Sequence, residues 1–342
     1  FIGSEILMGL GVVHFMGVLL EPFMRPVFNV PGAGSFVLAM GLASGYPIGS
    51  ILTARLRRQG LCSKTEGERL MSFCNTADPL FMSGAVAVGM FRRADVAGII
   101  MLAHYLSALS VGIALRFYAP RADAGPAREE SGGVNVGLRA LRALSNARER
   151  DGRPLGQLLG DAVRNSVNTL LVIGGFIIVF SVVIRIMDLA GAVRLLAGAI
   201  AAVAAPLGLD PSTAPSLVSG LFEITIGTEA ASQAPASLNQ RLIAAGAIIA
   251  WSGLSVHAQV AAMVHGTGLS VLPYVGARLL HAALAGLYTA LLLPFFPLPA
   301  AAVAPPAAEG WVQSLGHHVV RFVAVSGLLL WAAAASAGAR RL

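Results

Sequence analysis

The chain has little charge for its length. Only 12% of its 342 residues are charged, whereas 56% are hydrophobic, and its mean hydropathy is +0.74. A soluble domain has about a quarter of its residues charged. The composition therefore excludes an ordinary soluble enzyme. It predicts an all-α fold, a polytopic helical membrane protein with about 8–10 transmembrane segments of roughly 20 residues each.

Cysteine and lysine are also scarce. The two cysteines, Cys62 and Cys74, fall in a predicted loop and a predicted span, which argues against a disulfide or a metal site. The only lysine, Lys64, follows Ser63 and so does not complete a Walker A loop. His-Glu-x-x-His and Gly-x-Ser-x-Gly are absent too. We therefore predict a protein that is not an enzyme and has no cofactor and no metal.

The charge that is present is mostly arginine, and the formal net charge is +7. In a soluble protein this excess would suggest a nucleic acid partner, but in a membrane protein it orients the chain. The positive-inside rule places the loop 55–69 and the linker 119–164 in the cytoplasm. Residues 134–150 of that linker are expected to form an amphipathic helix on the membrane surface. Contact between these arginines and anionic lipid heads is an alternative role for them.

The apolar segments divide the chain into four predicted parts. These are a first membrane repeat (1–118), a cytoplasmic Arg-rich linker (119–164), a second membrane repeat (165–296), and a Pro/Ala-rich loop with a C-terminal span (297–342). The apolar start of the chain has no basic region or cleavage site, so we interpret it as a span and not as a signal peptide.

An internal repeat relates the two halves. Gly49 and Gly227 lie 178 residues apart, and so do Phe73 and Trp251, within polar runs that follow in the same order. If every segment crosses once and 166–187 is an extra span, the two halves are inverted. Inverted repeats with interrupted helices are the architecture of secondary transporters. The prediction depends on 192–208, because the inverted relation fails if that short segment lies flat.

Each half contains one segment that is not expected to stay helical across the bilayer. Residues 44–49 place a proline between two glycines, and residues 223–229 put two carboxylates and two hydroxyls around a glycine. Irregular backbone is tolerated at membrane depth only where it faces protein or water. We therefore predict two interrupted or re-entrant helices at a central site, where helix N-termini present amides to an anion. The alternative is that Gly41, Gly45 and Gly49 form a stripe of small residues that only packs helices.

The polar residues of these segments and of the spans that follow them are the candidate site. The substrate-binding candidates are Ser44, Gly45, Tyr46, Pro47, Gly49, Asn75, Thr76, Thr225, Gly227, Thr228, Ser252, Ser255 and Gln259. The coupling candidates are Asp78, Glu223, Glu229 and His257. A carboxylate within a span is costly unless it is paired, protonated or hydrated, which makes the three acids functional candidates.

Structural alternatives stay open for these residues. The acids can occupy rim positions near an interface, and His257 can be a hydrogen-bonded packing residue instead of a proton relay. Arg278 either pairs with a substrate carboxylate or extends to the interface from a span end. His104 and His281, which are isolated on apolar helices, are expected to be packed and hydrogen-bonded.

Several of the runs together resemble the YlbJ family of sporulation integral membrane proteins, also called stage V sporulation protein V, within the wider nucleoside-recognition (Gate) group. The resembling runs are 44–49, 63–66, 73–82, 84–91, 220–227 and 255–260. The resemblance implies a role in endospore formation, in which dipicolinic acid is moved across the outer forespore membrane. Tyr46 or Phe73 would then either stack on the pyridine ring or pack in the core. Acids near a dianion suggest proton or sodium coupling.

Three functions follow as hypotheses. The first is a secondary transporter for a small anionic aromatic solute, dipicolinic acid. The second is a cation-coupled nucleoside permease, and the third is a non-transporting membrane assembly protein of the spore envelope. The predicted partners are a small-molecule substrate and the lipid bilayer, with no nucleic acid. The oligomeric state stays open between a monomer and a homo-oligomer.

Overall fold

The fold is nearly all helical. A computed structural model describes residues 2–119, 136–296 and 298, and within these ranges it contains no strand. The predicted all-α class is therefore confirmed. The start of the linker at 120–133 and the predicted last span at 319–338 lie outside the described residues.

The first half contains two bent helices followed by a series of short ones. Its elements are α1 (Ile2–Gly9), α2 (Val12–Phe28), α3 (Gly34–Ser44), α4 (Ile48–Arg58), α5 (Lys64–Cys74), the π-helix η1 (Phe81–Met90), the short 3₁₀ turn η2 (Ala94–Val96) and α6 (Ala97–Leu115).

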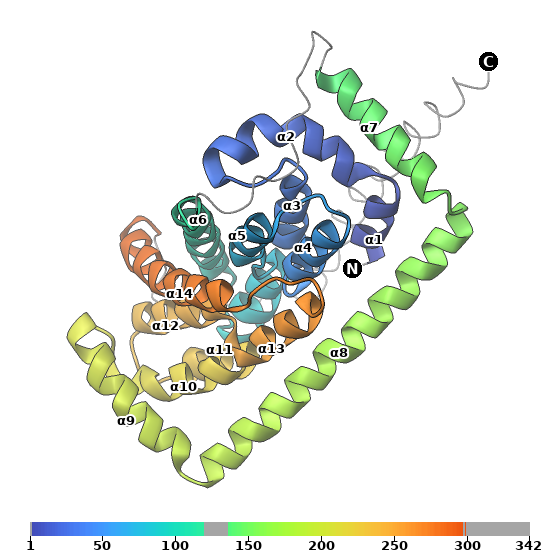
Figure 1. The fold of residues 1–342 in the computed structure, drawn as a ribbon. Coiled ribbons are helices and arrows are strands. Elements are labelled where there is room, and N and C mark those ends of the chain that lie inside the picture. Colours follow the sequence, from blue (N-terminus) through green and yellow to red (C-terminus); the bar gives the residue numbers. More distant parts are fainter. Residues whose placement is uncertain (1, 120–135, 297, 299–342) are drawn as a thin grey trace.

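The second half begins with a helix of the linker, continues with the longest helix, α8, and then has a further series of mostly short ones. Its elements are α7 (Val136–Asp151), α8 (Leu155–Leu189), α9 (Ala192–Ala204), η3 (Ala205–Leu207), η4 (Pro211–Thr213), α10 (Ala214–Phe222), α11 (Ile224–Gln233), α12 (Leu238–Trp251), α13 (Gly253–Val264), α14 (Leu272–Leu292) and η5 (Leu293–Phe295). In Figure 1, α8 runs along one edge of the bundle, and α9 follows it at the lower corner.

Few described helices are long and apolar enough to cross a membrane alone. Four stretches qualify in the described part of the chain, and the pair α1 and α2, bent by 81°, would make a fifth. The four are Ala94–Leu115, Leu155–Leu189, Leu238–Val264 and Leu272–Phe295. Several apolar segments of the sequence are therefore helices that break or turn back.

The segments 35–55 and 214–234 are re-entrant hairpins. The arms α3 and α4 contact each other, as do α10 and α11, and each arm has 9 to 11 residues. An arm of that length rises about 17 Å or less, whereas the hydrocarbon core is roughly 30 Å thick. At the second hairpin a Cβ on Gly227 would lie 2.2 Å from the Cα of Gly220, so the arms pack backbone to backbone. Two interrupted or re-entrant helices were expected, and hairpins with arms this short fit the re-entrant form.

Two other segments are interrupted. The segment after α5 loses helical structure before η1, and α12 passes into α13 at Ser252, which has a φ of 72°. The stretch Leu238–Val264 still qualifies as one span. In contrast, α9 has only 13 residues, about 20 Å, and is too short for a straight crossing. Whether 192–208 crosses therefore stays an open part of the prediction, and the short helix favours the alternative in which it does not.

The glycines of the first hairpin fit it against α5. A Cβ on Gly41 would lie 1.9 Å from the carbonyl oxygen of Cys74, and one on Gly49 would lie 2.5 Å from the same atom. Gly45 has a φ of +74° and lies against the Asp78 side chain. The stripe of small residues therefore packs helices, as one of the two interpretations predicted.

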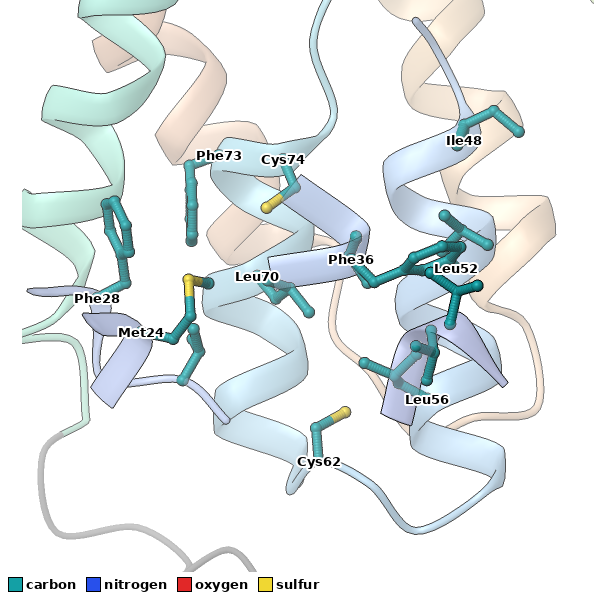
Figure 2. Packing of buried hydrophobic residues seen from close by; sticks show 14 of the residues in the cluster. Met24, Phe28, Phe36, Ile48, Leu52, Leu56, Cys62, Leu70, Phe73 and Cys74 are labelled. Atoms are coloured by element: carbon teal, nitrogen blue, oxygen red, sulfur yellow. The ribbon is translucent and has the colours of Figure 1, made fainter. Parts of the chain in front are cut away.

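The apolar core of this half surrounds α5. Phe28 and Phe73 stack with their ring centres 4.7 Å apart, and Gly112 on α6 leaves the space that both rings occupy. Figure 2 shows Phe73 and Leu70 of α5 beside Met24 and Phe28, with Phe36 pointing toward Leu52. This packing fixes the position of α5 and of the break that follows it.

The linker residues that the structure describes are helical. α7 contacts α2, and its Ala140 is fully buried. A helix within 134–150 was expected, although its position on a membrane surface stays a prediction. Since α8 begins at Leu155, a helix covers the predicted boundary between linker and second repeat. The four-part division also stays a prediction.

We predict that Gly41→Ala destabilises the protein, because its Cβ would overlap the Cys74 carbonyl. The expected loss is about 1–3 kcal/mol of unfolding free energy. Gly84→Ala is the matched control, because its Cβ would meet only Leu80 Cδ1, at 3.5 Å. Thermal unfolding of the detergent-solubilised protein measures both, and an unchanged Tm for Gly41→Ala would contradict the packing described here.

Candidate functional site

Asn75 connects the first hairpin to α14. It follows α5 at the first break, and its side chain is fully buried. Its Oδ1 accepts the backbone N–H of Ser50 at 3.4 Å, and its Nδ2 donates to the Tyr274 hydroxyl at 3.0 Å. One carboxamide thus joins the start of α4, the break after α5 and the first turn of α14.

Arg278 closes the carboxyl end of α5. The side chain is fully buried on α14; one terminal nitrogen donates to the Asn75 carbonyl at 2.9 Å and the other donates to the Ser72 carbonyl. These are carbonyls that a helix end leaves without partners, and they carry partial negative charge. The Nε of Arg278 has no hydrogen-bond partner in the described residues. Because its side chain is fully buried, Arg278 does not extend to the membrane–water interface from the end of a span.

Glu223 lies at the turn of the second hairpin and caps α11. Its Oε2 accepts the N–H groups of Thr225 and Ile226 at 2.8 and 2.9 Å, and also the Thr225 hydroxyl. A carboxylate at this position satisfies amides that the helix start leaves free. The side chain is fully buried, yet its other oxygen, Oε1, has no partner in the described residues.

The second break packs directly on the second hairpin. A Cβ on Gly253 would lie 3.0 Å from the Cα of Glu223, and the Trp251 indole N–H donates to the Leu221 carbonyl at 3.0 Å. From the first hairpin, the Tyr46 hydroxyl donates to the Ile249 carbonyl at 3.0 Å. Both hairpins and both breaks therefore meet at one centre.

His257 lies between two aromatic rings in this centre. Its ring centre is 4.3 Å from that of Trp251 and 5.2 Å from that of Tyr274. Its Nδ1 lies 2.8 Å from the Gly253 carbonyl, which can only accept, so Nδ1 carries a proton. Its Nε2 faces no partner among the described residues and is free to accept or gain a proton.

Six buried polar atoms of the centre lack hydrogen-bond partners within the described residues. They are Ser50 Oγ, Glu223 Oε1, Ser252 Oγ, Ser255 Oγ, His257 Nε2 and Arg278 Nε. Their side chains are at most 6% exposed. Buried polar atoms normally have partners, and leaving one without costs about 1–3 kcal/mol. We call these six the free polar atoms; they include both donors and acceptors of hydrogen bonds.

Several predicted site residues are placed in local structural contacts instead. Asp78 accepts the Phe81 N–H at 2.8 Å, and Thr76 donates to the Gly41 carbonyl at 3.1 Å. Glu229 is partly exposed and accepts from Gln233 one turn along its own helix, and Thr228 donates to the Ile224 carbonyl at 2.7 Å.

The remaining candidates lie around the turns or on α13. Ser44 ends α3, Pro47 precedes α4, and Gln259 is buried on α13 two residues beyond His257. The functional roles of all these residues stay predictions.

Two residues of the centre were not in the predicted binding set. Arg278 was predicted only as one of two alternatives, a partner of a substrate carboxylate or an interface residue; it is the only charged residue of the apolar segment 271–296, and an isolated charge within a span is a signal for a functional residue. Tyr274, one turn earlier, faces both Asn75 and His257, and no sequence signal distinguishes it from a packed aromatic residue.

These features define a polytopic helical membrane protein in which two re-entrant hairpins enclose a polar centre. Its sequence is 46% identical over 296 residues to the sporulation integral membrane protein YlbJ of Bacillus subtilis (strain 168), covering 85% of this chain and 72% of that protein. The chain belongs to the YlbJ family. Residues 170–278 match the family model Gate, described as nucleoside recognition. The resemblance stated from the sequence is confirmed.

Solved structures of CNTnw resemble the chain more distantly. The inward-facing, substrate-bound state has a TM-score of 0.42 at 16% identity, covering 84% of this chain and 73% of that one. A variant in an outward-facing state has a TM-score of 0.45 at 14% identity, covering 85% and 74%.

We predict that Glu223→Gln destabilises the fold more than Glu229→Gln does. Both changes neutralise a carboxylate of the same hairpin, but only Glu223 is fully buried and holds two backbone amides. The expected loss for Glu223→Gln is about 1–2 kcal/mol. Thermal unfolding in detergent compares the two; a larger fall in Tm for Glu229→Gln would contradict the capping role.

Proposed function

We propose that the protein is a secondary transporter of a small anionic aromatic solute, dipicolinic acid, in the outer forespore membrane. The observation that carries the proposal is the set of six free polar atoms at the meeting point of both hairpins and both breaks. Irregular backbone at membrane depth requires a protein or water-filled surrounding, and transporters place their substrates there. In this proposal the chain binds and moves its solute unchanged and is not an enzyme.

The groups of the centre suit a planar dicarboxylate. Arg278 Nε and the serine hydroxyls can donate to carboxylate oxygens. The starts of α4 and α11 add partial positive charge. The free oxygen of Glu223 would repel a dianion, so a proton or a cation at Glu223 would have to enter with the substrate. His257 Nε2 is a second position for that proton.

Two such hairpins also support an inverted repeat. If α5 with η1, α6 and α8 each cross the membrane, three crossings separate the hairpins and their orientations are opposite. In this arrangement the inversion of the hairpins does not require 192–208 to cross. Residues separated by about the repeat spacing also meet: the rings of His104 and His281, 177 residues apart, lie 4.7 Å apart, and the hydroxyls of Ser110 and Tyr288, 178 residues apart, lie 2.9 Å apart. Contacts between equivalent residues are expected at a two-fold axis.

A cation-coupled nucleoside permease is the second candidate. It is favoured by the match of residues 170–278 to a nucleoside-recognition model. The amide of Asn75, the hydroxyls of Ser252 and Ser255, and the free oxygen of Glu223 can bind ribose hydroxyls and base edges. Which solute the protein transports distinguishes the two candidate functions.

We predict that purified protein in liposomes takes up radiolabelled dipicolinate and not uridine. Uptake is expected to depend on an imposed proton or sodium gradient, because Glu223 must be neutralised. Uptake of uridine alone would replace the first candidate by the second. If neither compound enters, both transport functions are wrong, and a structural role in the spore envelope is the remaining hypothesis.

We further predict that Ser255→Ala lowers the apparent affinity for the transported solute about tenfold, because a hydrogen bond to a charged group is lost. Its Tm should not fall, since Ser255 Oγ has no partner in the described residues. Ser181→Ala is the control, because the Ser181 hydroxyl donates to the Ile177 carbonyl on α8 at 2.7 Å. If Ser255→Ala and Ser181→Ala have the same affinity for the solute, the substrate does not bind at Ser255.

A further inference from the structure

A second polar region lies away from the centre, between α4, α8 and α13. A cavity of about 340 Å³ opens there. Its polar lining comes from the last turns of α4 and from the first half of α8: Arg55, Arg58, Asn165, Asn168 and Thr169. Ala262 and Met263, near the end of α13, form its apolar side. None of these residues belongs to the candidate substrate site.

The lining has an excess of one positive charge. Arg55 forms an ion pair with Glu5, and the second oxygen of Glu5 accepts from Asn165 Nδ2 at 3.2 Å. Arg58 has no carboxylate partner in the described residues; its NH2 group reaches only the carbonyls of Met263 and His265, both at 3.5 Å. A group with a single negative charge therefore complements this lining better than a dianion does.

Along α8 the cavity wall changes from polar residues to exposed apolar residues, which matches the polar headgroup and apolar chains of a lipid. Asn165, Asn168 and Thr169 face the cavity, and the residues that follow, from Leu170 to Val172, are exposed and apolar. Exposed Ile178 and Val179 continue this surface. In Figure 1, α8 lies along the edge of the bundle, and it qualifies as a membrane span with little of its surface buried. A headgroup in the cavity would thus leave its acyl chains beside an apolar helix.

We propose that the cavity binds the phosphate of an anionic phospholipid with a single negative charge. Arg58 donates to the phosphate oxygens, and the Asn168 amide and the Thr169 hydroxyl supply further donors. The acyl chains lie along α8 from Leu170 onward. Basic pockets between helices at the membrane boundary are a recurrent form of headgroup site. The bound lipid connects α8 to α4, which follows the first hairpin turn, and to α13, which follows the second break.

Native mass spectrometry of the purified full chain tests this site. The protein is titrated with phosphatidylglycerol or phosphatidylcholine of the same acyl length. We expect one phosphatidylglycerol to bind about tenfold more tightly than phosphatidylcholine, and Arg58→Gln to abolish the difference. Arg164→Gln is the matched control, because Arg164 is exposed on α8 beside Asn165 but does not line the cavity. Equal binding of both lipids by the unchanged protein would overturn the proposal.

A second variant and a competitor sharpen the result. Asn168→Leu keeps the charge but removes an amide donor, and we expect it to weaken phosphatidylglycerol binding while leaving Arg58 in place. Inorganic phosphate and dipicolinate serve as soluble competitors. If either displaces phosphatidylglycerol at equal concentration, the cavity is a site for soluble anions and the lipid assignment is wrong. An equal loss of binding in Arg164→Gln and Arg58→Gln would also overturn it, by showing a diffuse charge effect.

Discussion

The hydrogen bonds from Arg278 to the end of α5 are the interaction on which the polar centre depends. A helix that stops inside a membrane protein leaves carbonyl oxygens without partners, and lipid supplies none. The buried guanidinium satisfies the carbonyls of Ser72 and Asn75 and so stabilises the break. Asn75, held in place, can then bind Ser50 and Tyr274. Without this cation two carbonyls at the end of α5 would lose their partner, and the backbone that positions the Asn75 carboxamide would no longer be held.

In the second half a helix end is also stabilised by a buried charged side chain, but the charge is negative. There the helix start needs acceptors, and the Glu223 carboxylate satisfies the amides of Thr225 and Ile226. A cation therefore closes a carboxyl end and an anion closes an amino end, as the helix dipole favours. Each group also keeps one atom free, Nε of Arg278 and Oε1 of Glu223. The charges that stabilise the breaks are therefore the ones that remain available to a solute.

Local chemistry predicted much of this arrangement from the sequence. The proline between glycines at 44–49 and the acids at 223–229 identified both hairpin turns, because such residues do not fit a continuous buried helix. The sequence did not reveal that α3 and α4, or α10 and α11, fold back on each other, since a hairpin and a crossing helix have the same apolar composition. Gly49 was predicted either to belong to the substrate site or to pack helices, and only the Cys74 carbonyl beside it reveals the packing contact. Tyr274 belongs to the centre through tertiary contacts alone.

The structure also separates residues that hold the centre from residues that are available to it. Asp78 and Thr76 use their polar atoms on the backbone of neighbouring segments, so replacing them would disturb the fold first. Ser50 and Ser255 are equally buried, but their hydroxyls hold nothing in the described residues. A buried polar group without a hydrogen-bond partner lowers the stability of the fold, so several such groups in one region require an explanation other than stability. Binding of a polar solute at that place would return the missing hydrogen bonds.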